Sequence, residues 1–431
     1  MADESASTDK VVRDRDFRVN SIQLIGSDGV AVDISAMIIE LTIRQDMFAN
    51  YINGNMLVVD GMGMLNSRGV HGSEYLLIDL FEPGRNLKIK KAFRIFKINN
   101  RETTTSNAQR YVIHFVSDEM VHSNLKRVSK AYKKTTISAI VEDIIVNYMG
   151  ITRYRIEKTN SQVDVVIPSW RPTEAINWLA RRAEAGKKRF CYLFYENLDG
   201  FWFRSLHSIY KDEPCNVQPY VFEPKSTQPD LALNKFTIDS FSAKDFDVAS
   251  AYARGAVSMR FTGVDPVHRT FKNNDISIDD IPTLHELNLI DDLIDPGTDE
   301  TLYEQYNAAQ LCHLQTEATA TELGNNADVW VRHIQSLAML NNNLYRVTMP
   351  GNLEVQVGRL VRLIFPNFTT PTVTDDTLTE NATFLVVAVT HTFNMPLGTF
   401  DTSFAVTRDS APELPALDAS LPVKVRNLNE K

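Results

Sequence analysis

A chain of 431 residues is too long for one ordinary hydrophobic core, so two to four domains are expected. Its composition, with 43% hydrophobic and 23% charged residues, is that of a soluble globular protein, and a formal net charge of −9 argues against nucleic acid as the main partner. Three scattered cysteines, at 191, 215 and 312, are too few for a disulfide scaffold, and no apolar run of about eighteen residues predicts a membrane span.

The first β-unit is predicted from the alternating patterns between residues 16 and 117. Residues 1–15 are charged and polar and lack the apolar segment of a signal peptide, so we expect an arm on a protein made in a reducing cytoplasm. Short strands at hairpin spacing then predict an antiparallel sheet or barrel, at 17–25, 30–33, 37–45, 55–60, 75–81, 93–99 and 110–115. An aromatic loop interrupts this series, and its Phe48 and Tyr51 are predicted contact residues.

Residues 118–231 are predicted to form an α+β unit. Amphipathic helices are expected at 118–128 and 135–149, the second closed by Gly150. A strand at 165–167 should stop at Pro168, and Pro172 should open a helix that Gly186 ends. A hairpin follows at 190–206, apolar on both faces. We predict a core or interface role, with core favoured, for the large aromatic residues Trp170, Trp178, Tyr192, Phe194, Phe201 and Trp202.

The rest of the chain returns to β character twice. Residues 232–265 are expected to rejoin the first β-unit, which would make the α+β unit an insertion. Residues 266–342 are predicted to connect the domains, with helices at 301–321 and 328–340, and residues 273–331 contain thirteen Asp and Glu but no Lys or Arg. A second small antiparallel barrel is predicted at 343–409, followed by a proline-containing arm at 410–431.

The charges are unevenly distributed along the chain. Basic clusters stand against the acidic segment, at 85–97, 126–134 and 181–189. Each cluster alone is explained by a solvated face. Together, patches of opposite sign on one chain are what a self-assembling subunit uses to fix its register.

No motif predicts a catalytic, metal or cofactor site. Glu196 and Asp199 are the best pair of acids, but a hairpin turn favours solvated carboxylates there. His207 lacks the ligand spacing of a zinc site, and the acidic segment lacks the glycine-centred loop of a calcium site. The glycines of VVDGMGMLNSRG are not followed by a third at position 66, so nucleotide binding is not expected. The chain is therefore interpreted as a structural protein, not an enzyme.

Two regions resemble a known family. The run VVIPSWRPTEAINWLARRA, followed by RFCYLFYENLDGFWFRSL, resembles the corresponding module of baseplate hub proteins from contractile-tailed bacteriophages. The pattern from Pro350 to Asp409 resembles the second barrel of that family and of the related type VI secretion spike. The resemblance implies an α+β, mainly β chain with two tube-like barrels, 16–117 plus 232–265 and 343–409, around an inserted α+β domain.

The resemblance also implies a function. A homotrimer with two barrels per chain would form a pseudo-sixfold ring in the tail baseplate of the virion, after synthesis in the bacterial host cytoplasm. The ring would join a hexameric tail tube to a trimeric central spike, contact baseplate wedge proteins, and let DNA pass through its lumen without specific binding. Two alternatives stay open: a tail-associated peptidoglycan hydrolase that uses Glu196, and a spike or hub of a cellular contractile injection system.

Overall fold

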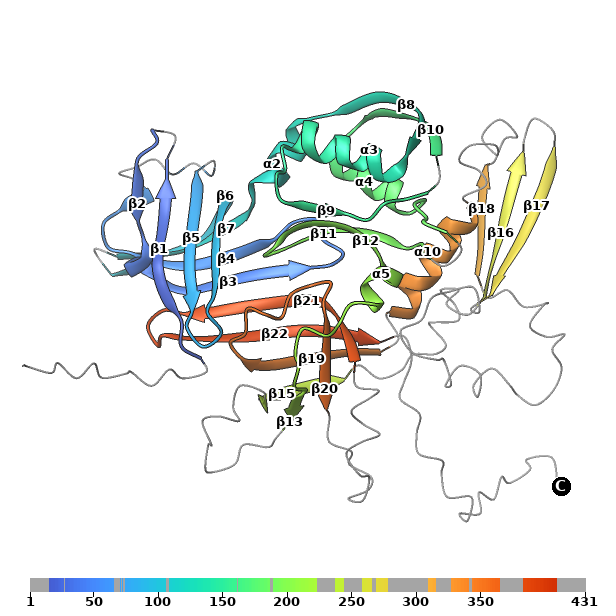
Figure 1. Ribbon diagram of the computed structural model, residues 1–431. Helices are drawn as coiled ribbons and strands as arrows, with labels where there is room; N and C mark the ends of the chain where they lie inside the picture. Colours follow the sequence, from blue (N-terminus) through green and yellow to red (C-terminus); the bar gives the residue numbers. More distant parts are fainter. Residues whose placement is uncertain are drawn as a thin grey trace, which may run out of the picture.

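The computed structural model of the protein describes residues 15–26, 28–65, 70, 72, 74–105, 108–160, 162–186, 189–222, 237–243, 258–265, 269–277, 309–314, 327–340, 343–364 and 383–408. Strands outnumber helices in these residues, so the predicted class, α+β and mainly β, is confirmed. Figure 1 shows a large sheet at the left and below, a helix-containing unit above it, and a small three-stranded sheet at the right.

The first β-unit is an antiparallel sheet in the order β3–β4–β7–β6–β5–β1–β2. Buried and half-buried residues alternate along β4 and β5, as expected for strands with one face on a core. The elements are β1 (Arg18–Ile25), β2 (Ala31–Asp33), the short 3-10 helix η1 (Ser35–Met37), β3 (Ile38–Asp46), β4 (Asn53–Asp60), β5 (Tyr75–Glu82), β6 (Leu87–Thr105) and β7 (Ala108–Ser117).

The second β-unit is built from C-terminal strands and three short ones that precede them. Its antiparallel core is β19–β22–β21–β20, and β13 lies parallel to both β20 and β14. The strands are β13 (Tyr220–Phe222), β14 (Thr237–Ile238), β15 (Ser240–Ala243), β19 (Asn343–Pro350), β20 (Leu360–Ile364), β21 (Thr383–Asn394) and β22 (Thr399–Arg408).

The predicted return of 232–265 to the first β-unit is wrong. β15 pairs with β19, so it belongs to the second β-unit. Residues 258–265 form a strand of a separate small sheet. Apolar alternation indicates that a segment is a strand but does not identify its neighbour, because every half-buried strand shows the same period.

One seam joins the two β-units into a single sheet of fourteen strands. β3 pairs antiparallel with β21, from Asp46 opposite Ala388 to Glu40 opposite Asn394. The described pairings of the first β-unit end at β2 and do not return to β3, so residues 16–117 do not close into the predicted barrel. The edge of β3 pairs with β21 instead, so the backbone groups along this edge are hydrogen-bonded.

The α+β unit follows the predicted order of elements with shifted boundaries. Pro172 is the first residue of its helix, as predicted, but the helix ends at Ala180, before Gly186. The preceding strand continues through Pro168 to Trp170 by a register shift after Ile167, where a missing N–H is tolerated. The elements are α2 (Asp118–Leu125), β8 (Val128–Thr136), α3 (Ile137–Asp143), the π-helix η2 (Ile144–Met149), β9 (Tyr154–Ile156), β10 (Gln162–Trp170), α4 (Pro172–Ala180), β11 (Tyr192–Asn197), β12 (Gly200–Ser205) and α5 (Leu206–Tyr210).

Local signals explain the ends of its helices. Thr136 precedes α3 and caps it, because its side-chain oxygen accepts a hydrogen bond from the N–H of Ala139. Gly150 ends η2 with a φ of 71°, the left-handed conformation that glycine adopts without strain. The predicted helix at 118–128 is shorter than expected and ends at Leu125.

In its described residues, the connecting part of the chain contains a small three-stranded sheet and one helix. β16 (Ser258–Asp265) pairs antiparallel with β17 (Thr270–Ser277) and parallel with β18 (Ala309–Leu314). The helix predicted at 301–321 is wrong for 309–314, which form β18, and its other residues lie outside the described ranges. Helix α10 (Ala327–Leu340) matches the prediction, and three of its residues, Val329, Ala338 and Leu340, pack into the core of the second β-unit. Most of the acidic segment and both predicted arms, except Arg15, lie outside the described residues.

Candidate functional site

The hairpin of β11 and β12 lies between two hydrophobic cores. β11 is buried along its whole length, as the apolar pattern on both of its faces predicts. Tyr192 and Phe194 join the core of the α+β unit, whereas Leu193 and Tyr195 join the core of the second β-unit. Separating the two units would therefore expose one apolar face of β11 to water.

Three of the predicted aromatic residues form a buried cluster, and a fourth packs on it. Tyr192, Phe194 and Phe201 are each at most 2% exposed. The rings of Phe194 and Phe201 stack with centroids 5.7 Å apart, and the ring of Tyr51 meets Phe201 edge-on at 6.2 Å. Tyr51 reaches the cluster from the loop after β3, so this contact joins the first β-unit to the α+β unit.

The three tryptophans among the predicted site residues lie at the margins of these cores. Trp202 is half-buried, and its indole N–H donates a hydrogen bond to Oδ1 of Asn197 at 2.8 Å. Trp170 and Trp178 meet edge-to-face at 5.4 Å and line an open cavity of about 340 Å³ together with Glu174 and Arg181. Their half-exposed rings give this cavity an aromatic wall.

Glu196 is buried, contrary to the expectation of a solvated turn carboxylate. Its carboxylate accepts hydrogen bonds from the N–H of Ile52 at 2.8 Å and the hydroxyl of Ser117 at 2.6 Å, and it forms an ion pair with Lys91. Burial raises the pKa of this carboxyl, and the nearby Lys91 opposes that shift. Asp199, the other predicted acid, is 44% exposed and pairs with Arg359 at 2.6 Å.

This arrangement does not resemble the pair of catalytic carboxylates of a hydrolase. All the partners of Glu196 named above come from the first β-unit, so the carboxylate ties the hairpin to β6, β7 and the start of β4. The hydrolase alternative named Glu196, and a buried carboxylate held by an ion pair and two hydrogen bonds within the protein does not support it. The sequence pattern could not reveal this, because the partners of Glu196 lie about eighty to one hundred and fifty positions away in the chain.

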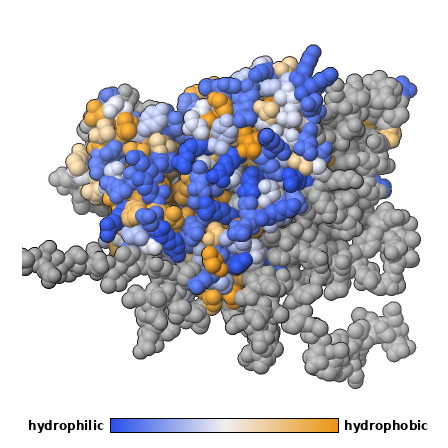
Figure 2. All heavy atoms as spheres, in the orientation of Figure 1, coloured by the Kyte–Doolittle hydropathy of each residue, from blue (hydrophilic) through white to orange (hydrophobic). Residues whose placement is uncertain are grey.

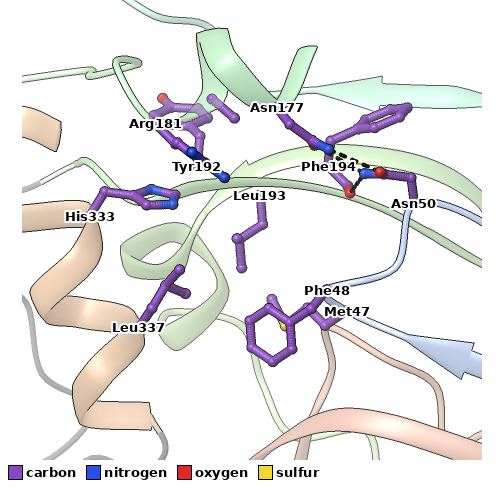
Figure 3. Close-up of a pocket in the computed structure, with 11 residues that line it drawn as sticks. Met47, Phe48, Asn50, Asn177, Arg181, Tyr192, Leu193, Phe194, His333 and Leu337 are labelled. Carbon is purple, nitrogen blue, oxygen red and sulfur yellow. Dashed lines mark hydrogen bonds between the residues drawn. The ribbon is translucent and has the colours of Figure 1, made fainter. Parts of the chain in front are cut away.

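A second cavity opens where the first β-unit, the α+β unit and α10 meet, and we call it the junction cavity (Figure 3). Its volume is about 230 Å³. Figure 3 shows His333 and Leu337 reaching in from α10, with Arg181 and Tyr192 above and Met47 and Phe48 at the opposite side. The lining residues are Met47, Phe48, Asn50, Asn177, Ala180, Arg181, Tyr192, Leu193, Phe194, His333 and Leu337.

Two asparagines brace one wall of the junction cavity. The side-chain amide of Asn50 donates to Oδ1 of Asn177 at 3.1 Å and to the carbonyl of Phe194 at 2.8 Å, and Asn177 donates back to Oδ1 of Asn50 at 3.0 Å. These bonds hold the loop after β3 against α4 and β11. Of the predicted site residues, the cavity brings together Phe48, Tyr192 and Phe194.

Sequence reasoning missed His333, Asn50 and Asn177. His333 had a usable signal, because Val329, His333 and Leu337 follow each other at four-residue spacing on one face of α10. A histidine in an apolar stripe is either a satisfied core residue or part of a site, and only the packing decides which. The two asparagines carry no periodic signal, since each is short, polar and surrounded by ordinary helix or loop residues.

The outward face of the seam carries a ladder of polar side chains. Cross-strand partners place Ser240, Thr348, Ser403, Thr390, Arg44 and Asn53 in one row across β15, β19, β22, β21, β3 and β4. A neighbouring row contains Asp401, Thr392, Thr42, Asn55 and His114. Most of these side chains are short and uncharged, and all except the buried Thr42 are exposed or half-buried, whereas the opposite face of the same strands is buried and mainly apolar. We call these two rows the polar ladder.

Other surfaces give no sign of a metal site or a membrane-spanning element. Within the described ranges, no three His, Cys, Asp or Glu side chains gather closely enough to hold a metal ion. Among the described helices, none is long and apolar enough to cross a bilayer. The face in Figure 2 is mainly hydrophilic with small separate hydrophobic patches.

Comparisons with known proteins agree with the predicted resemblance. No family model matches the chain. The probable baseplate hub protein gp334 of Vibrio phage KVP40 is 24% identical over 199 residues, which are 45% of this chain and 46% of that protein. The match therefore spans about half the length of this curated relative. The predicted resemblance to baseplate hub proteins is confirmed.

Solved structures of phage tail proteins share the fold. The tail protein from Neisseria meningitidis MC58 has a TM-score of 0.55 at 10% identity, covering 91% of this chain and 97% of that one. The 43 kDa tail protein of prophage MuSo2 from Shewanella oneidensis has a TM-score of 0.55 at 9% identity, covering 90% and 98%. At such low identity the agreement concerns the fold, and it extends over nearly the whole chain.

Proposed function

We propose that this protein is the structural hub of a phage tail baseplate, a ring of three copies between the tail tube and the central spike. The observation that carries the proposal is the seam between β3 and β21, which makes one continuous sheet of two β-units in each chain. Three such sheets supply six β-units around one axis, the number needed to match a hexameric tube to a trimeric spike.

Barrel-like closure of the second β-unit is part of the proposal. Its support is the order of pairing, which passes from β19 through β22, β21, β20 and β13 to β14. Directly after β14, the N–H of Asp239 donates to the carbonyl of Thr348 at 2.9 Å, and β15 then pairs with β19. The short connection from β14 to β15 thus brings the chain back to β19, which supports barrel-like closure.

The polar ladder is the surface that we assign to the lumen. Short hydroxyl and amide side chains offer DNA weak, exchangeable hydrogen bonds. The charged side chains of the two rows include the exposed Arg44 and the half-buried Asp401, which pairs with Arg15. Strong retention of DNA requires clustered cations, because phosphate contacts dominate affinity. A wall of this composition would let DNA slide without specific binding. The α+β unit would then lie outside, towards wedge proteins of the baseplate in the virion.

Native mass spectrometry of the purified protein, alone and with its tail tube protein, tests the proposal. One chain has a mass of 48.8 kDa, and the expected particle contains three copies. A particle that stays monomeric in both samples, or that contains two or four copies, would contradict the hub. The same sample also allows a direct test of position, because electron microscopy of a trimer should place β3 and β21 next to the central hole.

A further inference from the structure

The junction cavity has a polar end with an unsatisfied atom. His333 is 5% exposed, and its Nδ1 is buried without a hydrogen-bond partner among the described residues. Burial lowers the pKa of His333 to about 3, so the ring is neutral at pH 7. A buried polar atom without a partner destabilises the protein, and a group that enters the cavity from outside would relieve this cost.

The same end of the cavity is positively charged. Arg181 lines the cavity from the end of α4, is exposed to solvent, and contributes to the lowered pKa of His333, so its charge acts on the imidazole. None of the eleven residues that line the cavity is an acid. A guanidinium beside a neutral imidazole suits a carboxylate, which can accept from both.

Apart from the Asn50 and Asn177 pair, the remaining side chains of the cavity are apolar or aromatic. Leu193, Leu337 and Met47 form its inner walls, and Phe48 leaves 51% of its surface exposed beside them. A volume of about 230 Å³ fits a group the size of a branched side chain together with a carboxylate. The ligand that matches both ends is therefore a carboxylate on an apolar stem.

We propose that the junction cavity binds a carboxylate on an apolar stem, presented by an acidic, apolar segment of a partner protein in the assembled tail. Its carboxylate contacts Arg181 and His333, and its stem packs on Leu193 and Leu337.

A protein segment fits better than a small acid because the apolar surface continues outside the cavity. Arg181 lines both the junction cavity and the cavity walled by Trp170 and Trp178. Together with the exposed ring of Phe48, these residues form an aromatic and arginine-containing surface wider than a small molecule covers. Trp and Arg are the residue types that most often anchor protein interfaces.

The first test measures binding of a probe by methyl NMR. Isocaproate carries a carboxylate on a branched apolar stem, and isocaproamide is the matched neutral compound. We expect isocaproate to shift the methyl signals of Leu193 and Leu337 until binding saturates. Isocaproamide should bind at least about tenfold more weakly. Arg181→Gln should remove this preference, whereas Arg171→Gln, an exposed arginine outside the cavity, should keep it. Equal binding of acid and amide, or no shift with either, would overturn the site.

The second test asks whether a protein segment is the occupant. Benzoylphenylalanine at position 48 is photoactivated in assembled tails, and the cross-linked peptide is sequenced. We expect a peptide with an Asp or Glu beside an aliphatic or aromatic residue, and we expect Arg181→Gln but not Arg171→Gln to abolish the cross-link. A peptide without an acid, or a cross-link that persists in Arg181→Gln, overturns the proposal. If isocaproate binds but no cross-link forms, the ligand is a free acid and the partner segment is refuted. Neither result depends on the number of copies in the ring.

Discussion

At the scale of single residues, Glu196 is the most constrained polar group of the junction. Removing its carboxylate leaves the N–H of Ile52 and the hydroxyl of Ser117 without the acceptor and Lys91 without its counter-ion. We expect Glu196→Ala to lower the free energy of unfolding by about 3–5 kcal/mol, and Glu196→Gln, which keeps an acceptor, by less. Urea denaturation measures both. Asp199→Asn is the control, with an expected change below about 1 kcal/mol, and an equal effect of Glu196→Ala and Asp199→Asn would contradict this account.

Tyr192 occupies a core position, whereas Trp178 occupies a position at the rim of the core. Tyr192 is fully buried, whereas the half-exposed Trp178 lies at the edge of an open cavity with the guanidinium carbon of Arg182 over its ring at 4.0 Å. We expect Tyr192→Ala to cost about 3–5 kcal/mol of unfolding free energy and Trp178→Ala only about 1–3 kcal/mol, because part of the indole already contacts water. Thermal or urea unfolding of the two variants under one set of conditions tests the order. A larger loss for Trp178→Ala would place this side chain in the core.

At the scale of elements, a buried histidine makes the seam sensitive to acid. His391 on β21 is fully buried and lies between the side chains of Thr402, 3.1 Å from Nδ1, and Gln45, 3.4 Å from Nε2. Burial lowers its pKa to about 3. Since the unfolded chain binds the proton with a pKa near 6.5, this histidine's contribution to stability is complete above pH 6.5 and decreases as the pH falls.

The expected size of this pH effect is about 2 kcal/mol between pH 7 and pH 5 for His391 alone. His333 has the same direction of pKa shift, so the wild-type protein should lose more over this interval. We expect His391→Gln to lose less unfolding free energy between pH 7 and pH 5 than the wild type does. The difference should equal the contribution of His391. Urea titrations at several pH values measure the slope. An unchanged slope in His391→Gln would show that its ring is charged or exposed in the folded protein.

The kind of each element was easier to predict than its neighbour. The prolines, glycines and apolar spacing of 165–206 correctly indicated a strand, a helix and a hairpin in order, because these signals act within a few residues. The partner of β15 and the continuation of β3 into β21 depend on pairing over hundreds of positions, for which a single sequence has no local signal. The prediction of a solvated carboxylate at Glu196 was wrong for the same reason. Its position in a hairpin turn suggested contact with solvent, but partners far away in the chain bury it.

At the scale of the whole molecule, the parts are connected by shared residues rather than by separate linkers. β11 serves two cores, Glu196 ties the hairpin to the first β-unit, and α10 packs on the second. The predicted number and order of units follow from composition and periodicity. Their arrangement around a common junction does not, because it is decided by which apolar faces fit together. Shared cores are a stiffer connection than flexible segments, which would suit the hub role that we propose.

The polar ladder gives the last prediction, because we propose that its short, mostly uncharged side chains line the path of the DNA. We expect Thr390→Lys with Thr392→Lys to slow DNA release from triggered particles, since two lysines per chain, repeated around the ring, would add phosphate contacts. Release is measured with a DNA-binding dye and should recover as the salt concentration is raised. Each lysine–phosphate contact releases counter-ions, so these contacts weaken in salt. Ser129→Lys with Ala131→Lys, on exposed positions of β8, adds the same charge outside the sheet and should leave release unchanged. If both pairs slow release equally, or neither does in particles that assemble normally, then the face that carries Thr390 and Thr392 does not line the path of the DNA.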